Sequence, residues 1–247
     1  MVFVITCLPI AKTINKAQEL GIDVIYGDTD SIFLRGASQD QIKVLEGWSE
    51  KELGMELDVD KSYRYSVFSS RKKNYLGVFP DGSVDVKGLT GKKKHIPLFI
   101  KKSFLQLEEW LAPVKSPSEF EAAKKGIQEI VRNCYLKLKR HEFSLDELAF
   151  HVVLGAAPGQ YVKTTPQHVK AALLLQERGI DLRAGDLISF VKVVKEPHVK
   201  PIQLASKSEV DVDKYVGYLH SAFDQVFDAL GLDFNEIIGL TKLERWI

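Results

Sequence analysis

The chain has 247 residues, of which 45% are hydrophobic and 27% charged, and its formal net charge is +1. This composition excludes an intrinsically disordered chain, a collagen-like repeat and a disulfide scaffold, and the length fits one large domain or two small ones. Only two cysteines are present, which favours a reducing, intracellular setting. The uncharged stretch from Met1 to Ala11 is too short to span a bilayer and has no basic residues before it, so we expect neither a signal peptide nor a membrane anchor.

The nearly neutral net charge conceals an uneven distribution along the chain. Residues 1–60 carry a net charge of −6, whereas residues 61–102 hold 11 basic side chains and only two acids, for a net charge of +9. Clustered positive charge is the electrostatic footprint of nucleic-acid binding, although a charged segment is also often just a solvated face.

The first elements in chain order are a helix and a hairpin. Residues 9–20 predict a short helix that ends at Gly21. Two β-prone runs follow, at residues 22–26 and 31–35, and the turn-forming residues 27–30 separate them. This pattern predicts a β-hairpin that carries two carboxylates at its tip.

The next elements continue a mixed α and β pattern. Ser38 and Gln41 form a capping-box pattern for a helix that ends near Gly54. Further strands are predicted at residues 56–60, 63–69, 75–79 and 83–87, with Asp81 and Gly82 as the turn of the last hairpin. We therefore expect an α+β domain over residues 1–95.

After residue 95 the sequence becomes mainly helical. Capping signals and apolar spacing predict helices that begin near Ser116, Ser144 and Pro166, and another over residues 213–230. Residues 187–195 predict a single buried strand. We expect residues 96–247 to form a second, mainly helical domain.

Asp28 and Asp30 are the first candidates for chemistry, because an extended segment would place both on one face and carboxylates suit hard ions such as Mg²⁺. A simple polar turn is the alternative that needs no function. A calcium loop is excluded, because Ile32, Phe33 and Gln39 occupy its required positions. A phosphatase-like nucleophile would need a second acidic pair later in the chain, which we do not find.

The surroundings of these two acids resemble a known family. Residues 26–31 read Tyr-Gly-Asp-Thr-Asp-Ser, which resembles the Tyr-x-Asp-Thr-Asp-Ser signature of family B DNA polymerases. Residues 71–75 resemble the Lys-Lys-x-Tyr element of that family, residues 86–89 resemble its Lys/Arg-Gly segment, and residues 160–190 resemble its thumb. The resemblance implies an α+β fold in which the C-terminal half of a polymerase palm, an antiparallel sheet with helices, is followed by the thumb.

Other family motifs are absent from the sequence. The upstream Asp-x-x-Ser-Leu-Tyr-Pro-Ser motif, the nucleotide-gripping Lys-x-x-x-Asn-Ser-x-Tyr-Gly helix and the proofreading carboxylates do not occur. Since the chain opens with Met1 and ends on a plausible terminus, we expect a naturally split archaeal-type polymerase whose larger chain supplies the exonuclease, fingers and remaining palm. An engineered fragment is the alternative.

The resemblance also implies the roles of individual residues. Asp30 would be the essential catalytic ligand of two Mg²⁺ ions and Asp28 a weaker or transient one. Lys72, Lys73 and Tyr75 match the element that follows the primer–template duplex, where phosphate contacts position the DNA without reading its sequence. An edge strand protected by charge is the alternative for the two lysines.

Two further sets of residues match more weakly. Tyr161, Lys163 and His168 match a thumb segment that cradles the DNA, although Tyr161 would also suit a core and His168 a helix cap. At the C-terminus, Leu243, Trp246 and Ile247 resemble a degenerate sliding-clamp-binding peptide, with packing onto the thumb as the alternative.

We therefore expect a subunit of a DNA-directed DNA polymerase that uses primer–template DNA and dNTPs. We expect it to be cytoplasmic and nucleoid-associated, and inactive without its partner chain. The alternative from another class is a non-catalytic DNA-binding accessory subunit with a vestigial palm.

Overall fold

A computed structural model describes residues 2–4, 10–28, 30–70, 73–88, 95–161 and 164–239. The chain divides into two compact units, one of Met1–Val67 with Arg71–Lys87 and one of Phe68–Ser70 with Gly88–Ile247. Both units combine helices with sheets whose strand pairs are antiparallel. The predicted α+β fold class is thereby confirmed.

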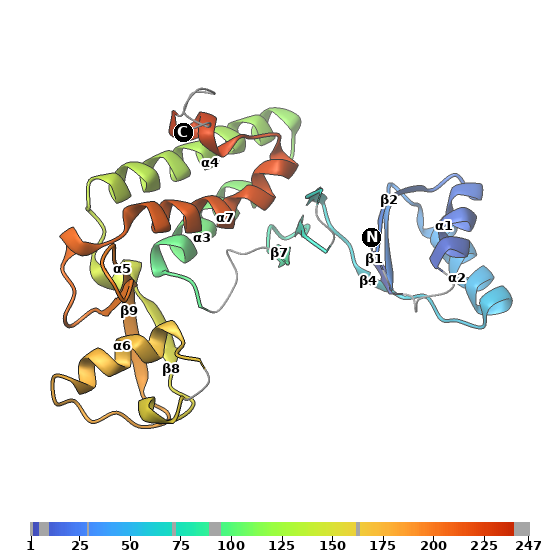
Figure 1. The fold of residues 1–247 in the computed structure, drawn as a ribbon. Helices are drawn as coiled ribbons and strands as arrows, with labels where there is room; N and C mark the ends of the chain where they lie inside the picture. The colour runs from blue at the N-terminus through green and yellow to red at the C-terminus, as the bar shows by residue number, and fades with distance from the viewer. Residues whose placement is uncertain are drawn as a thin grey trace. The chain divides into compact units, whose positions relative to one another are not determined.

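The first unit contains a four-stranded sheet with the strand order β2-β3-β1-β4. Helices α1 and α2 lie on one side of this sheet (Figure 1). Between helices and sheet lies an apolar core that includes Ala17, Ile32, Leu34 and Leu45. The bounds are β1 (Val2–Val4), α1 (Ile10–Glu19), β2 (Asp23–Gly27), β3 (Ser31–Arg35), α2 (Gln39–Leu53) and β4 (Val59–Lys61).

Local sequence signals explain where α2 begins and ends. The Ser38 hydroxyl accepts a hydrogen bond from the Gln41 amide at 3.2 Å, and the Gln41 side chain accepts one from the Ser38 amide at 3.0 Å. This reciprocal pair satisfies amides that the first helical turn leaves without partners. At the other end, Gly54 adopts a left-handed conformation with φ 63°.

The first unit continues into a second sheet with the order β5-β6-β7. Its strands are β5 (Tyr65–Phe68), β6 (Tyr75–Val78) and β7 (Val84–Lys87). The predicted turn joins β6 to β7: Gly82 has φ 89°, and the Asp81 carboxylate accepts hydrogen bonds from the Ser83 amide and hydroxyl. Turn chemistry thus fixes the register of this hairpin.

Helices dominate the second unit. They are α3 (Leu98–Leu111), α4 (Pro117–Lys139), α5 (Leu145–Leu148), α6 (Gln167–Gln176), α7 (Val212–Leu230) and α8 (Phe234–Ile238). Figure 1 shows α3, α4 and α7 running alongside one another. Phe99, Phe104 and Phe223 are fully buried among them. No helix among the described residues is long and apolar enough to cross a membrane.

The second unit also holds a sheet that the sequence did not predict in full. Its order is β10-β9-β8, with β8 at Phe150–Val153, β9 at Leu187–Lys192 and β10 at Val199–Pro201. The buried strand predicted at residues 187–195 is present as β9, although it ends at Lys192, whereas its neighbours β8 and β10 were not predicted. Strands of three or four residues are too short to show a periodic pattern.

Candidate active site at the β2–β3 hairpin

A β-bulge determines which side chains of β2 face the helices. Val24 pairs with Leu34, but Tyr26 pairs with Phe33, so Ile25 is an extra residue in β2. Val24 and Leu34 belong to the helix-side core, whereas Phe33 points to the other face of the sheet. Because a bulge turns the following side chains over, Tyr26 lies on the Phe33 face. Asp28, two residues further on, follows on that same face.

The two candidate carboxylates lie where the hairpin turns. The Asp28 amide donates to the Ser31 carbonyl at 2.8 Å, which closes the hairpin next to the turn. The Asp28 side chain is 23% exposed, whereas Asp30 lies in a bend and is exposed. The hairpin and its carboxylate tip were predicted correctly. Asp28 and Asp30 can therefore both be reached by a ligand at this end of the sheet.

Lys73 connects the second motif to this hairpin. Its ammonium nitrogen lies 3.9 Å from Asp28 Oδ2, and its backbone amide donates to the Tyr26 hydroxyl at 2.9 Å. Lys73 has a left-handed backbone with φ 65°, which is uncommon for a residue other than glycine. The structure thus brings the Lys-Lys-x-Tyr element and the Asp-Thr-Asp hairpin together. Sequence reasoning did not assign Tyr26 a role, and only the bulged register reveals one.

Tyr75 belongs to an aromatic cluster on the same face of the sheet. Its ring meets Phe33 edge-on, with centroids 4.9 Å apart, and lies 6.4 Å from Tyr63. Tyr26 also meets Phe33 edge-on at 5.5 Å. Burial raises the pKa of the Tyr75 hydroxyl. These ring contacts link the hairpin that carries Asp28 to the strand that follows Lys73.

A polar network fixes the far side of the aromatic cluster. Asp85 accepts hydrogen bonds from the Tyr63 hydroxyl at 2.5 Å and from the Lys61 ammonium at 2.6 Å. Burial acts to raise the pKa of the Asp85 carboxyl, but these two donors outweigh it, so the pKa lies below its usual range. Burial and the bond to Asp85 raise the pKa of Tyr63.

The donor chemistry at the hairpin fits a hard divalent cation. Asp28 and Asp30 offer carboxylate oxygens, the ligands that Mg²⁺ prefers. Among the described residues, however, no three His, Cys, Asp or Glu side chains gather into a group that could hold a metal ion.

Two of the thumb candidates lie together in the second unit. The rings of Tyr161 and His168 meet at right angles with centroids 6.2 Å apart. The Tyr161 hydroxyl accepts hydrogen bonds from the amides of Gly155 and Ala156 at 3.1 and 3.2 Å. These bonds hold the backbone of residues 155 and 156 in place. Burial, and secondarily His95, lowers the pKa of His168, so its imidazole is mostly neutral at pH 7. The remaining candidates, Lys72, Lys163, Leu243, Trp246 and Ile247, lie outside the described residues.

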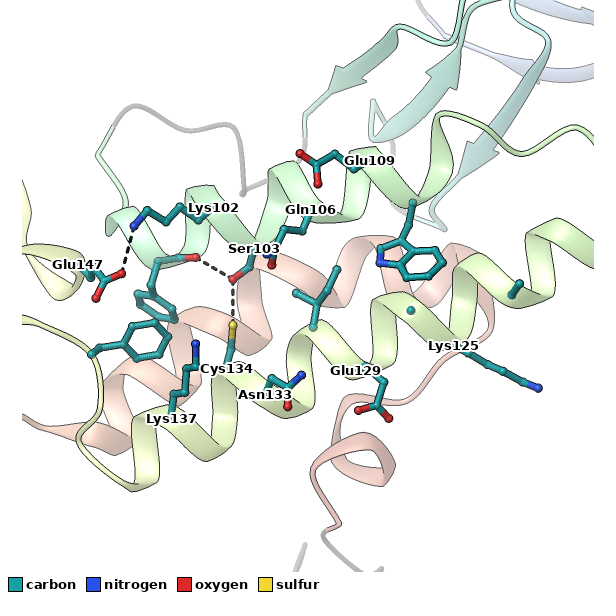
Figure 2. Close-up of a pocket in the computed structure, with 16 residues that line it drawn as sticks. Lys102, Ser103, Gln106, Glu109, Lys125, Glu129, Asn133, Cys134, Lys137 and Glu147 are labelled. Carbon is teal, nitrogen blue, oxygen red and sulfur yellow. Dashed lines mark hydrogen bonds and ion pairs between the residues drawn. The ribbon is translucent and has the colours of Figure 1, made fainter.

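A separate groove of about 990 Å³ runs between α3 and α4 in the second unit (Figure 2). Acidic and basic side chains alternate along it, among them Lys102, Glu109, Glu129 and Lys137, so its charge favours neither a polyanion nor a polycation. In its floor the Ser103 hydroxyl lies 2.9 Å from the Cys134 sulfur. Burial raises the pKa of Cys134, which makes this thiol a poor nucleophile.

Comparison with known proteins identifies the family. Residues 4–230 match the family model described as DNA polymerase family B. The chain belongs to DNA polymerase family B. The matched range includes the β2–β3 hairpin, the Lys73 segment and the second unit through α7, so the family B assignment covers every element that forms the candidate site.

Several relatives with this match are archaeal DNA polymerases. DNA polymerase 1 of Sulfolobus acidocaldarius is 41% identical over 237 residues, which cover 96% of this chain and 27% of that protein. DNA polymerase 1 of Aeropyrum pernix is 39% identical and is matched over 94% of this chain and 24% of its own length. A solved structure of the family B DNA polymerase from Pyrobaculum calidifontis superposes with a TM-score of 0.64 and 31% identity, covering 87% of this chain and 28% of that one. The chain thus spans about a quarter of the length of the curated relatives it matches.

Proposed function

We propose that this chain is a subunit of a DNA-directed DNA polymerase and supplies metal-binding carboxylates and DNA-gripping surfaces to template-directed nucleotidyl transfer. The first unit corresponds to part of a palm and the second to a thumb. The remaining palm, the fingers and the exonuclease come from a second, larger family B chain, so the subunit is inactive alone. The complex acts on primer–template DNA and dNTPs in the cytoplasm, associated with the nucleoid.

The observation that carries this proposal is the junction of the two motifs in the first unit. Asp28 and Asp30 lie at the end of one hairpin, and Lys73 reaches Asp28 from a segment 45 residues later in the chain. A lysine beside these carboxylates would offset part of the repulsion between them and an approaching polyanion such as DNA. This arrangement suits a reaction in which DNA must approach metal-binding carboxylates.

Asp28 and Asp30 would hold Mg²⁺ together with at least one carboxylate of the partner chain, with Asp30 the essential ligand. Two Mg²⁺ ions bound there would stabilise the attacking 3′-oxygen and the leaving pyrophosphate oxygen of an in-line displacement. The chain's own residues orient the substrates. The contacts of Phe33 with Tyr26 and Tyr75 would stiffen the hairpin that carries Asp28, whose side chain is 23% exposed.

The DNA-binding role falls on residues of both units. The Lys73 side chain is 67% exposed, and its ammonium can contact the backbone of the primer–template duplex without reading sequence. Lys72 and Lys163 would add to this electrostatic grip, Tyr75 supports the Lys73 segment, and Tyr161 and His168 form one edge of the thumb surface. Leu243, Trp246 and Ile247 would bind a sliding clamp.

Primer extension with Mg²⁺ and dNTPs tests the proposal, with this chain alone, a candidate larger family B chain alone, and the two mixed. We expect synthesis only in the mixture. Asp30→Ala should abolish it and Asp28→Ala should impair it less, whereas Asp58→Ala, which removes an exposed acid of the same unit, should leave it unchanged. Synthesis that needs this chain but tolerates Asp30→Ala would instead identify a non-catalytic DNA-binding subunit. Synthesis by the larger chain that this chain does not alter would contradict the proposal.

A further inference from the structure

The Tyr26 hydroxyl occupies an unusual position for a strand residue. The bulge at Ile25 moves Tyr26 from the helix-covered face of the sheet to the face that carries Phe33 and Asp28. Its ring is held edge-on against the buried Phe33 ring at 5.5 Å. The ring therefore has a defined direction, and its hydroxyl reaches beyond the edge of β2.

The hydroxyl accepts the backbone amide of Lys73 at 2.9 Å, across 47 residues of sequence. Lys73 is one of only three residues other than glycine, within the described parts of the chain, that have a positive φ. A left-handed conformation is unfavourable for a residue with a Cβ atom, so it persists only where surrounding contacts hold it. The Tyr26 hydroxyl provides such a contact directly at the strained residue.

The strained backbone also directs the Lys73 side chain. Its ammonium lies 3.9 Å from Asp28 Oδ2, although the side chain is largely exposed. Tyr26 lies in β2 and Asp28 directly follows that strand on the same face, so a single hairpin carries both the hydroxyl that fixes the Lys73 backbone and the carboxylate that attracts its ammonium. A long, flexible lysine would otherwise sample many rotamers away from the hairpin.

We propose that Tyr26 is a positioning residue, whose hydroxyl holds Lys73 in its left-handed conformation and thereby aims the Lys73 ammonium at DNA bound beside the catalytic hairpin. This inference rests on the proposed function, because it concerns the DNA that the polymerase would hold. Tyr26 acts only through Lys73 and touches neither nucleotide nor metal ion. Its loss weakens the grip on DNA rather than the chemical step.

The first test measures the anchoring itself in the full chain without any partner. Exchange of the Lys73 amide hydrogen with solvent is followed by NMR in a ¹⁵N-labelled chain, for the unmodified protein, Tyr26→Phe and Tyr135→Phe. Tyr26→Phe keeps the ring against Phe33 and removes only the hydroxyl that accepts the hydrogen bond. Exchange of the Lys73 amide should therefore accelerate by about three- to tenfold, the range expected for one neutral hydrogen bond. Tyr135→Phe removes a hydroxyl from α4 and should change nothing at Lys73. An unchanged exchange rate in Tyr26→Phe would overturn the inference.

The second test measures the consequence for DNA through a double-mutant cycle. Affinity for a fluorescent primer–template duplex is determined at one fixed salt concentration for Tyr26→Phe, Lys73→Met and the combined variant. Tyr26→Phe alone should weaken binding about three- to tenfold and should have no further effect in the Lys73→Met background. An equal loss in both backgrounds, or a chain that binds no duplex, would overturn the inference.

The two proposals fail separately. Synthesis in the mixed primer-extension assay decides the proposed function, whereas the amide exchange and the cycle decide the role of Tyr26 in the chain alone. In the active mixture, Tyr26→Phe should raise the KM for primer–template and leave kcat nearly unchanged, a split that general loss of folding would not produce.

Discussion

Gly77 on β6 lies directly against the ring of Tyr63, so a Cβ atom at residue 77 would overlap carbon atoms of that ring. The ring has little freedom to retreat. The ring centroid of Phe79 lies 4.9 Å from that of Tyr63, and the Tyr63 hydroxyl donates a hydrogen bond to Asp85. Glycine is therefore needed at residue 77 for close approach, not for an unusual backbone conformation.

Gly77→Ala should lower the free energy of unfolding by about 1–3 kcal/mol, the usual cost of forcing extra volume into a packed site. Gly47→Ala is the matched control, because residue 47 lies on the exposed side of α2 and a Cβ atom there meets nothing within 4 Å. The control should stabilise the chain by about 0.5–1 kcal/mol, since alanine favours helix. Urea unfolding followed by circular dichroism measures both; equal shifts in the two variants would contradict the assigned contact.

Asp85 makes the stability of the first unit depend on pH. Its carboxyl has a lower pKa in the folded chain than in the unfolded one, so protonation favours unfolding. Its contribution is present above about pH 4, the unfolded pKa of an aspartate, and is lost as the pH falls through the folded pKa. The bond to Asp85 raises the pKa of Lys61, so the contribution of this lysine is lost only as the pH rises above about 10.5.

Asp85→Asn should therefore destabilise the chain by about 1–3 kcal/mol at pH 7, where it leaves Lys61 without its partner charge, and by progressively less below about pH 4. Unfolding measured at pH 7, 4 and 3 tests this trend. Asp58→Asn, which changes an exposed acid of the same unit, should show a small effect at every pH. A penalty for Asp85→Asn that stays constant down to pH 3 would show that the carboxylate charge is not what holds the network.

Local patterns predicted much of this structure. The capping boxes at Ser38 and Ser116, the turn at Asp81 and Gly82, and the carboxylate hairpin all lie where the sequence placed them, because each depends on residues within four positions of one another. The bond from Lys73 to Tyr26 could not be predicted in this way. It depends on the β-bulge at Ile25, a position whose residue type does not indicate a bulge. It also depends on a contact between residues 47 positions apart.

The helix α3 was missed for a related reason. It follows Pro97 with no side-chain cap, and its apolar residues are buried against α4 and α7, partners that local periodicity does not reveal. The groove of Figure 2 lies between these two helices and was therefore not predictable either.

In that groove, Gly126 on α4 lies against the indole of Trp110, which a Cβ atom at residue 126 would overlap. Trp110 is 45% exposed, so its indole can rotate outward, whereas Phe79 and the bond to Asp85 restrain the ring of Tyr63. Gly126→Ala should then change stability by less than about 1 kcal/mol, because the helical preference of alanine offsets lost contacts. The emission of Trp110, taken as the difference from the Trp110→Phe background, should shift to longer wavelength. An unshifted emission with a large loss of stability would mean that the indole cannot move.

Lys192 on β9 is a cation almost removed from solvent, with 5% of its surface exposed. Its ammonium lies 5.2 Å from the ring centroid of Phe150 and 5.3 Å from that of Phe190. Burial, with a smaller contribution from Lys214, lowers the pKa of Lys192 to about 8. Two effects thus oppose each other, since burial disfavours the charged form and the faces of the two rings favour it.

Lys192→Met decides which effect is larger. The unfolded lysine titrates near pH 10.5, so the unfolded chain binds more protons between about pH 8 and 10.5, and the stability of the unmodified protein should rise with pH across that window. Below about pH 8 the full cost of the buried charge is present, and Lys192→Met should stabilise the chain there by about 1–3 kcal/mol. The gain should vanish near pH 10.5, while Lys195→Met, an exposed neighbour, should show no such trend. A loss of stability in Lys192→Met at pH 7 would mean that Phe150 and Phe190 stabilise the ammonium by more than its burial costs.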